Sequence, residues 1–151
     1  SDDADKKTEE TSFALNYAMA FAGNFGAGLT YVSKSKKYDG DAATVGEVSS
    51  TIGLSGYYNV HGGWDDSCFV GLHYNMVTND DTATTDTGNK MTKIGLEYGH
   101  RFKVGSLGGM TFNWAPSVAY WMNTTAYNDD SKDDLNDTAL IINAANVAMT
   151  F

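Results

Sequence analysis

The sequence predicts an all-β fold in which one antiparallel sheet of seven countable strands closes into a barrel. First, large apolar residues alternate with small or polar residues over most of the chain, which is the pattern of strands with two different faces. Second, 16 glycines and a single proline suit a chain of strands joined by tight turns. Third, the large residues gather on one face of each strand, whereas the other face carries mainly Ala, Gly, Ser, Thr and Asn.

Length and charge set the broad class. The chain has 151 residues, enough for one domain. Residues 1–10 are charged and without periodicity, which favours a polar tail or loop remnant, and residues 11–151 form the predicted barrel domain. The net charge of −9 argues against nucleic acid or an anionic surface as a partner. No apolar run approaches the roughly 18 residues of a membrane-spanning helix.

The first two strands form the clearest hairpin. Phe13, Leu15, Tyr17, Met19 and Phe21 share one face of the first, and Phe25, Ala27, Leu29 and Tyr31 share one face of the second. Both runs keep the same parity, so we expect Phe21 to pair with Phe25 across residues 22–24. Asn24 is expected to take the left-handed conformation that such turns require.

The next four strands repeat the pattern. Their apolar faces are Val48, Ile52, Leu54, Tyr58 and Val60; Cys68, Val70, Leu72, Tyr74 and Met76; Ile94, Leu96, Tyr98 and Phe102; and Met110, Phe112, Trp114, Val118, Tyr120 and Met122. Short turns alternate with three long polar or acidic loops at residues 34–46, 78–89 and 124–134. Pro116 lies within the sixth strand and predicts a bulge, because proline cannot donate to the ladder.

The last strand, residues 139–151, ends the chain on an aromatic residue. Phe151, Met149, Val147 and Ala145 alternate with small or polar residues, and the same phase places Asn143 and Ile141 on the apolar side. A closing strand of this kind with a C-terminal Phe resembles the insertion signal of small bacterial outer-membrane β-barrel proteins. The resemblance implies that Val147, Met149 and Phe151 act as a C-terminal assembly signal, and that the protein resides in the bacterial outer membrane.

Two further features are similar to that class. The apolar face would contact outer-membrane lipid, with short turns on the periplasmic side and long acidic loops outside. Aromatic residues near both strand ends resemble interfacial belts. They are Phe21, Phe25, Tyr58, Phe102, Phe112 and Phe151 at the short-turn side, and Phe13, Tyr31, Tyr74 and Tyr120 at the other.

Seven strands depart from the even number of strands in bacterial single-chain barrels. Either an eighth, N-terminal strand is missing, or a segment interpreted as coil pairs after all, or several chains share one wall. We favour a homo-oligomer. The small residues on the inner face also suit a wide, wet interior.

The inner face carries one group of charges. Lys93, Glu97 and Arg101 recur at every fourth residue of one strand, and antiparallel pairing places His73 near Glu97. We interpret these four residues as a lumen charge cluster in which the charges satisfy one another. The alternative, a His–Glu pair that activates a serine in a lipid-modifying enzyme, requires a serine beside His73 at the outer, lipid-facing rim.

No residues are assigned to catalysis, to a cofactor or to a metal site. Asp129, Asp130, Asp133, Asp134 and Asp137 lack the spacing of a calcium loop, so we expect a solvated acidic loop with loose divalent cations at most. We therefore expect a non-enzymatic integral outer-membrane β-barrel protein that is structural or interacts through its acidic loops. The alternative is a porin-like aqueous pore, and the third possibility is a lipid-modifying enzyme.

Overall fold

The computed structural model describes residues 8–21, 23–38, 45–61, 64–81, 88–127 and 133–150. All regular structure in these residues is β-strand, and every strand pairing is antiparallel. The described residues contain no helix long and apolar enough to cross a membrane. The strands are β1 Thr8–Phe21, β2 Phe25–Tyr38, β3 Val45–Asn59, β4 Ser67–Asp81, β5 Asn89–Leu107, β6 Met110–Trp114, β7 Ser117–Tyr127, β8 Leu135–Asn143 and β9 Val147–Thr150.

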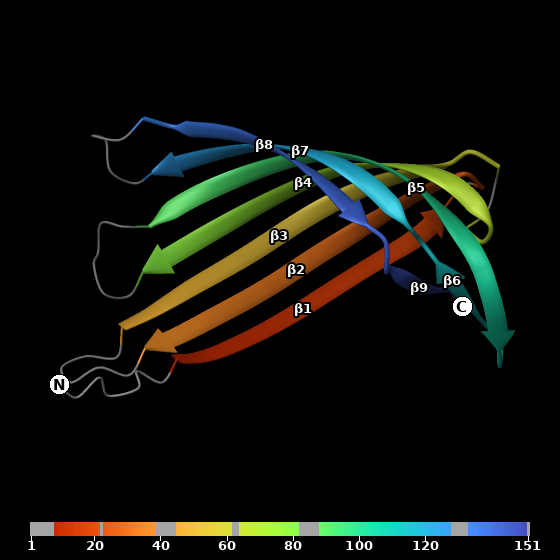
Figure 1. Cartoon of the computed structure of the whole chain (residues 1–151), viewed down its shortest axis with the longest axis horizontal. Helices are drawn as coiled ribbons and strands as arrows, with labels where there is room; N and C mark the ends of the chain where they lie inside the picture. The colour runs from red at the N-terminus through yellow and green to blue at the C-terminus, as the bar shows by residue number, and fades with distance from the viewer. Residues whose placement is uncertain are drawn as a thin grey trace.

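The strands form one sheet that curls into a half-barrel (Figure 1). β1 to β5 pair in sequence order, and the long β5 pairs with β7 along one half and with β6 along the other. β7 pairs with β8, and β6 pairs with β9. The nine strands therefore correspond to the seven predicted strands, because β6 and β7 are two parts of one predicted strand and β8 and β9 are two parts of another.

The first interruption confirms the irregularity predicted at Pro116. Ala115 and Pro116 separate β6 from β7, and the register of β5 against β6 shifts between Lys103 and Gly105. The Pro116 carbonyl still accepts a hydrogen bond from the His100 N–H, at 3.1 Å. The break therefore costs the sheet one ladder donor without disconnecting the two halves.

The first hairpin has the predicted register but not the predicted turn conformation. Phe21 pairs with Phe25, as expected. The left-handed residue is Gly23, with φ of 70°, and not Asn24. Glycine adopts positive φ without a steric penalty from a Cβ, so it takes this position in preference to its asparagine neighbour.

The strands at the long-loop end extend further than predicted. β2 continues through Lys34, Lys36 and Lys37 to Tyr38, although these residues belong to a predicted loop. Opposite charges face each other across this extension: Glu9 pairs with Lys37, and Lys36 lies between Glu10 and Glu47. Such cross-strand pairs stabilise an exposed ladder that has no apolar face.

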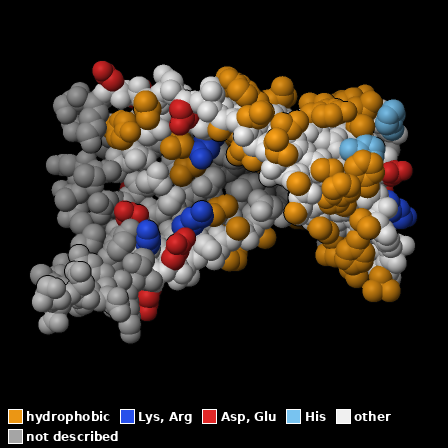
Figure 2. Space-filling model, in the orientation of Figure 1, with side chains coloured by type: hydrophobic (Ala, Val, Ile, Leu, Met, Phe, Trp, Pro, Cys, Tyr) orange, Lys and Arg blue, Asp and Glu red, His pale blue; other side chains and the backbone are white. Residues whose placement is uncertain are grey.

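The two faces of the sheet differ as the alternation predicts. The convex face exposes the large apolar residues of every strand, including Leu15, Leu29, Leu54, Leu72 and Leu96. The concave face carries glycines and polar residues, many of them buried. Figure 2 shows hydrophobic side chains concentrated toward the short-turn end, whereas many charged side chains lie toward the other end.

The predicted phase of the last strand is wrong for Asn143 and Ile141. The interruption at residues 144–146 resets the alternation, so that Asn143 pairs with the inward Ser117 and Ile141 with the inward Ala119. The outward residues of β8 are Leu140 and Ile142, which continue the apolar surface formed by Val147 and Met149 in β9. The convex face is therefore more uniformly apolar than the sequence pattern indicates.

Candidate functional site

The centre of the concave face holds a line of hydrogen-bonding side chains from three neighbouring strands. Ser55 of β3 and His73 of β4 are cross-strand partners, and Ser55 Oγ lies 2.8 Å from His73 Nδ1. His73 Nε2 lies 2.8 Å from Glu97 Oε2 of β5. The predicted proximity of His73 and Glu97 is confirmed, because Gly71 pairs with Glu97 and His73 pairs with Gly95.

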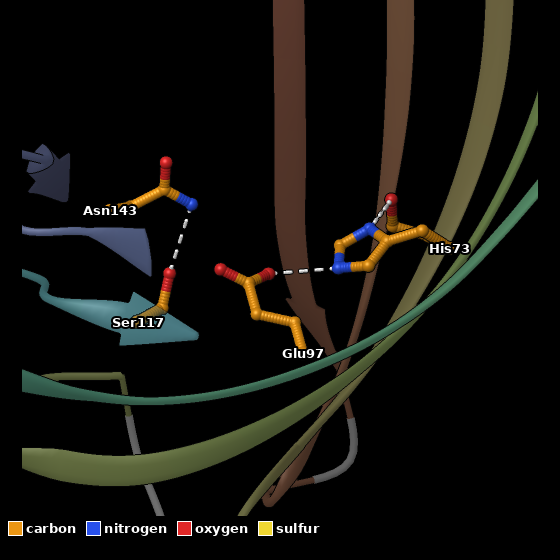
Figure 3. A network of polar contacts seen from close by, with 5 residues as sticks. His73, Glu97, Ser117 and Asn143 are labelled. Atoms are coloured by element: carbon orange, nitrogen blue, oxygen red, sulfur yellow. Dashed lines mark hydrogen bonds and ion pairs between the residues drawn. The ribbon is translucent and has the colours of Figure 1, made fainter. Parts of the chain in front are cut away.

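The line continues toward the last strand. Ser117 of β7 lies beside the Glu97 carboxylate (Figure 3). Asn143 Nδ2 of β8 donates to Ser117 Oγ at 3.3 Å. Side chains from β3, β4, β5, β7 and β8 thus form one polar network across the half-barrel. Because a buried polar group without a partner destabilises a fold, this network satisfies groups that the curled sheet removes from solvent.

Arg101 belongs to a different environment from the one predicted. Its guanidinium carbon lies 4.4 Å from the ring centre of Trp64 and 4.1 Å from that of Phe69, and Nη1 donates to Asn59 Oδ1 at 2.6 Å. The side chain is buried, and no ion pair joins it to Glu97 in the part of the chain that the structure describes. Arg101 is therefore held by aromatic faces and one amide, and the nearby carboxylates of Glu97 and Asp65 attract its charge.

Trp64 is a component of the site that the periodicity of the sequence does not indicate. It lies in the β3–β4 connection, yet its ring packs into the concave face at 5.8 Å from the ring of Tyr57. A Cβ at Gly26 of β2 would collide with the same ring, so glycine at that position makes room for it. The only signal in the sequence was an aromatic residue inside an otherwise polar turn.

Aromatic contacts join Trp64 to the polar line. Tyr57 also contacts Phe69 and His73, with ring centres 6.3 Å and 5.5 Å apart, and His73 contacts Trp121 at 5.5 Å. The large inward residues therefore form a single group rather than being spread over a wet lumen. We call this group the inner cluster. It consists of Tyr57, Trp64, Phe69, His73, Glu97, Arg101 and Trp121.

Lys93, the fourth member of the predicted charge cluster, is not brought into the inner cluster. It is half-buried on β5, where it pairs in register with Asn75 and Asn123. No ion pair to Lys93 is present within the described ranges. Of the four residues of the predicted charge cluster, His73, Glu97 and Arg101 therefore belong to the inner cluster, and Lys93 does not.

The remaining predicted residues lie away from the inner cluster. Val147 and Met149 are exposed on the convex face, and Phe151 lies outside the described residues. Of the acidic loop, Asp129 and Asp130 also lie outside them, whereas Asp137 pairs in register with Asn123. Over the ranges that the structure covers, no group of three or more His, Cys, Asp or Glu residues is placed to hold a metal ion.

A cavity of about 960 Å³ opens over the inner cluster. Ser55, Tyr57, Trp64, Glu97 and Arg101 line one side of it. Chemically, the polar groups that line this side are a hydroxyl, a carboxylate and a guanidinium packed between aromatic rings, which together can hydrogen-bond and orient a polar group within the half-barrel. Comparisons with protein-family models, with curated proteins and with solved structures find no match for this chain.

Proposed function

We propose that the chain is a non-enzymatic, integral β-barrel protein of the bacterial outer membrane, with a structural role or a role in surface interactions through its acidic outer loops. The observation that carries this proposal is the inverted distribution of side chains. Large apolar residues of every strand are exposed on the convex face, and buried polar groups occupy the concave face. Soluble proteins seldom expose so continuous an apolar surface, whereas a lipid-facing barrel requires one.

Aromatic pairs at two levels of the convex face support the same proposal. Near the short-turn end, Phe25 and Tyr58 lie with ring centres 5.2 Å apart, and Phe102 stacks on Trp114 at 5.4 Å. About halfway along β1 and β2, Phe13 lies 6.3 Å from Tyr31. Two such levels resemble the aromatic girdles that flank the apolar band of an outer-membrane barrel.

The porin-like alternative conflicts with the inner cluster. Stacked aromatic side chains and Arg101 occupy the concave face near the short-turn end, where an aqueous channel would have to continue. We therefore expect no steady single-channel conductance when the purified chain is added to planar bilayers. Discrete conductance steps that persist after Trp64→Ala, and are equal in size to those of the wild type, would favour the pore.

Deletion of Phe151 tests the predicted assembly signal. In cells, we expect the wild-type chain in the outer-membrane fraction. The amount of the shortened chain in that fraction should be lower, because the terminal aromatic is the residue that an insertion machine would recognise. In detergent, refolding should change much less, since the burial of one Phe contributes only about 1.5–3 kcal/mol. Fractionation and refolding yield measure the two effects. Equal losses in both assays would reduce Phe151 to a packing residue.

The enzymatic alternative is favoured by one observation, the Ser55–His73–Glu97 line with 2.8 Å at both steps. However, Ser55 lies on the concave face and not at the outer, lipid-facing rim. We expect a serine-reactive fluorophosphonate to leave the folded chain unlabelled. Labelling of Ser55 that disappears in His73→Ala, with the fold retained, would establish an activated serine and contradict the non-enzymatic proposal.

A further inference from the structure

The half-barrel has two free edges. Among the described residues, β1 pairs with β2 alone, β8 with β7 alone and β9 with β6 alone. Within the described ranges no backbone pairing joins β1 to β8 or β9. Each edge therefore presents a row of N–H and C=O groups without a partner strand, and such groups are costly to leave unpaired in hydrocarbon.

The two edge strands run in the same direction. Because every step across the sheet is antiparallel, β1, β3, β5 and the β8–β9 path all run from the long-loop end to the short-turn end (Figure 1). Direct closure of β1 onto β8–β9 would create a parallel pair, which is slightly less stable per residue. A second copy in the same orientation would also meet β1 in parallel. One added strand that runs in the opposite direction pairs antiparallel with both edges.

The edges also face a common space. The cavity of about 960 Å³ is lined on one side by Asn16 to Ala20 of β1 and on the other by Val147 to Met149 of β9. Its floor is the inner cluster. The two edges thus flank one opening rather than two unrelated surfaces.

Buried polar atoms at this end of the half-barrel lack partners. Within the described part of the chain, Asn59 Nδ2, Trp64 Nε1 and Asn113 Oδ1 have no hydrogen-bond partner. The other amide atoms of the two asparagines are bound to Arg101 and to Asp65, which both line the cavity. Of these three residues, Trp64 lines the cavity itself, and the two asparagines adjoin it through Arg101 and Asp65.

We propose that the gap between β1 and β8–β9 binds one further β-strand, supplied by a segment outside residues 1–151. This strand runs from the short-turn end to the long-loop end. It carries small or polar residues toward the inner cluster and apolar residues on the convex side. The apolar requirement rests on the proposed membrane function, whereas the direction and the backbone pairing rest on the sheet alone.

A synthetic peptide provides the probe. The peptide FGAGLTYVSKSKKY, the sequence of β2, has the required alternation, because Phe25, Leu29 and Tyr31 are outward and the intervening residues are small or polar. The control peptide carries Leu29→Pro and Thr30→Pro, which remove one N–H toward each edge. Each peptide is added to a chain of residues 1–151 in detergent micelles. Native mass spectrometry then gives the number of chains and peptides in each particle. Hydrogen exchange of the backbone amides is measured in β1 and β8.

Without peptide, we expect the backbone amides of β1 and β8 to exchange hydrogen at least about ten times faster than those of β3 and β4, because edge strands open more readily. The β2 peptide should bind once per chain and slow exchange in both edges by about tenfold, and the control peptide should do neither. Three results would overturn the proposal. In the first, the amides of β1 and β8 exchange slowly without peptide in a particle that contains one chain. In the second, they exchange slowly without peptide in a particle that contains several chains. In the third, the β2 peptide leaves the exchange of both strands unchanged. Because the experiment needs no bilayer, its failure is distinguishable from failure of the membrane proposal.

Discussion

Arginine at Leu54 or Leu96 is expected to prevent insertion of the chain into lipid bilayers. Both side chains lie near the middle of their strands on the convex face, with exposed fractions of 57% and 56%. A charged residue at such a lipid-facing position destabilises a membrane barrel by about 2–4 kcal/mol near the midplane. Two such changes together would cost about 4–8 kcal/mol, which is comparable with the whole stability of a marginally stable domain. Folding yield into phospholipid vesicles measures the effect.

The matched control is arginine at Asn16, which lines the cavity on the concave side of β1. It adds the same charge to the same sheet without placing it in lipid, so folding into vesicles should remain close to wild type. If Asn16→Arg reduces insertion as strongly as Leu54→Arg does, then the faces or the environment are wrongly assigned. The same conclusion follows if none of the three variants affects insertion.

Loss of the Trp64 ring should produce the largest change in stability from a single concave-face substitution. Trp64→Ala removes the ring that covers Arg101 and contacts Tyr57, and it leaves a void beneath Gly26. Truncation of a packed aromatic residue typically costs about 3–5 kcal/mol. Urea titration of the refolded chain, followed by circular dichroism, gives the difference in free energy of unfolding.

Trp64→Phe separates packing from polarity at the same position. The phenyl ring keeps an aromatic face over Arg101, and the lost Nε1 has no hydrogen-bond partner within the described residues. A smaller cost than that of Trp64→Ala is expected, because the phenyl ring keeps part of the volume that the indole fills. Equal stability of the Ala and Phe variants would show that the inner cluster does not hold the half-barrel together.

The features that follow from local alternation were predictable from the sequence. Phe21 pairs with Phe25, His73 lies next to Glu97, and Pro116 interrupts its strand. A period of two assigns each residue to a face as long as the strand is continuous. It fails where a break resets the phase, and this explains the error at Asn143, because Ala144, Ala145 and Asn146 contain neither glycine nor proline to signal a break.

Features that depend on distant partners were not predictable. The extension of β2 relies on Glu10 and Glu47, which lie on two other strands and show no apolar periodicity. Trp64 lies in a connection between strands, yet its ring packs against Tyr57 and over Arg101. Arg101 shares a strand and a face with Glu97, yet its closest neighbours include Trp64 and Phe69 from other parts of the chain.

Quenching of single-tryptophan variants by brominated lipid tests most directly whether the convex face contacts the membrane. Trp64→Phe with Trp121→Phe leaves Trp114, which is 45% exposed on the convex face. Trp64→Phe with Trp114→Phe leaves Trp121, which packs against His73 on the concave face. In vesicles brominated on the acyl chains near the headgroups, Trp114 should lose most of its emission and Trp121 little. Emission from both tryptophans that is unaffected by bromine, or stronger quenching of Trp121, would contradict a lipid-facing convex surface.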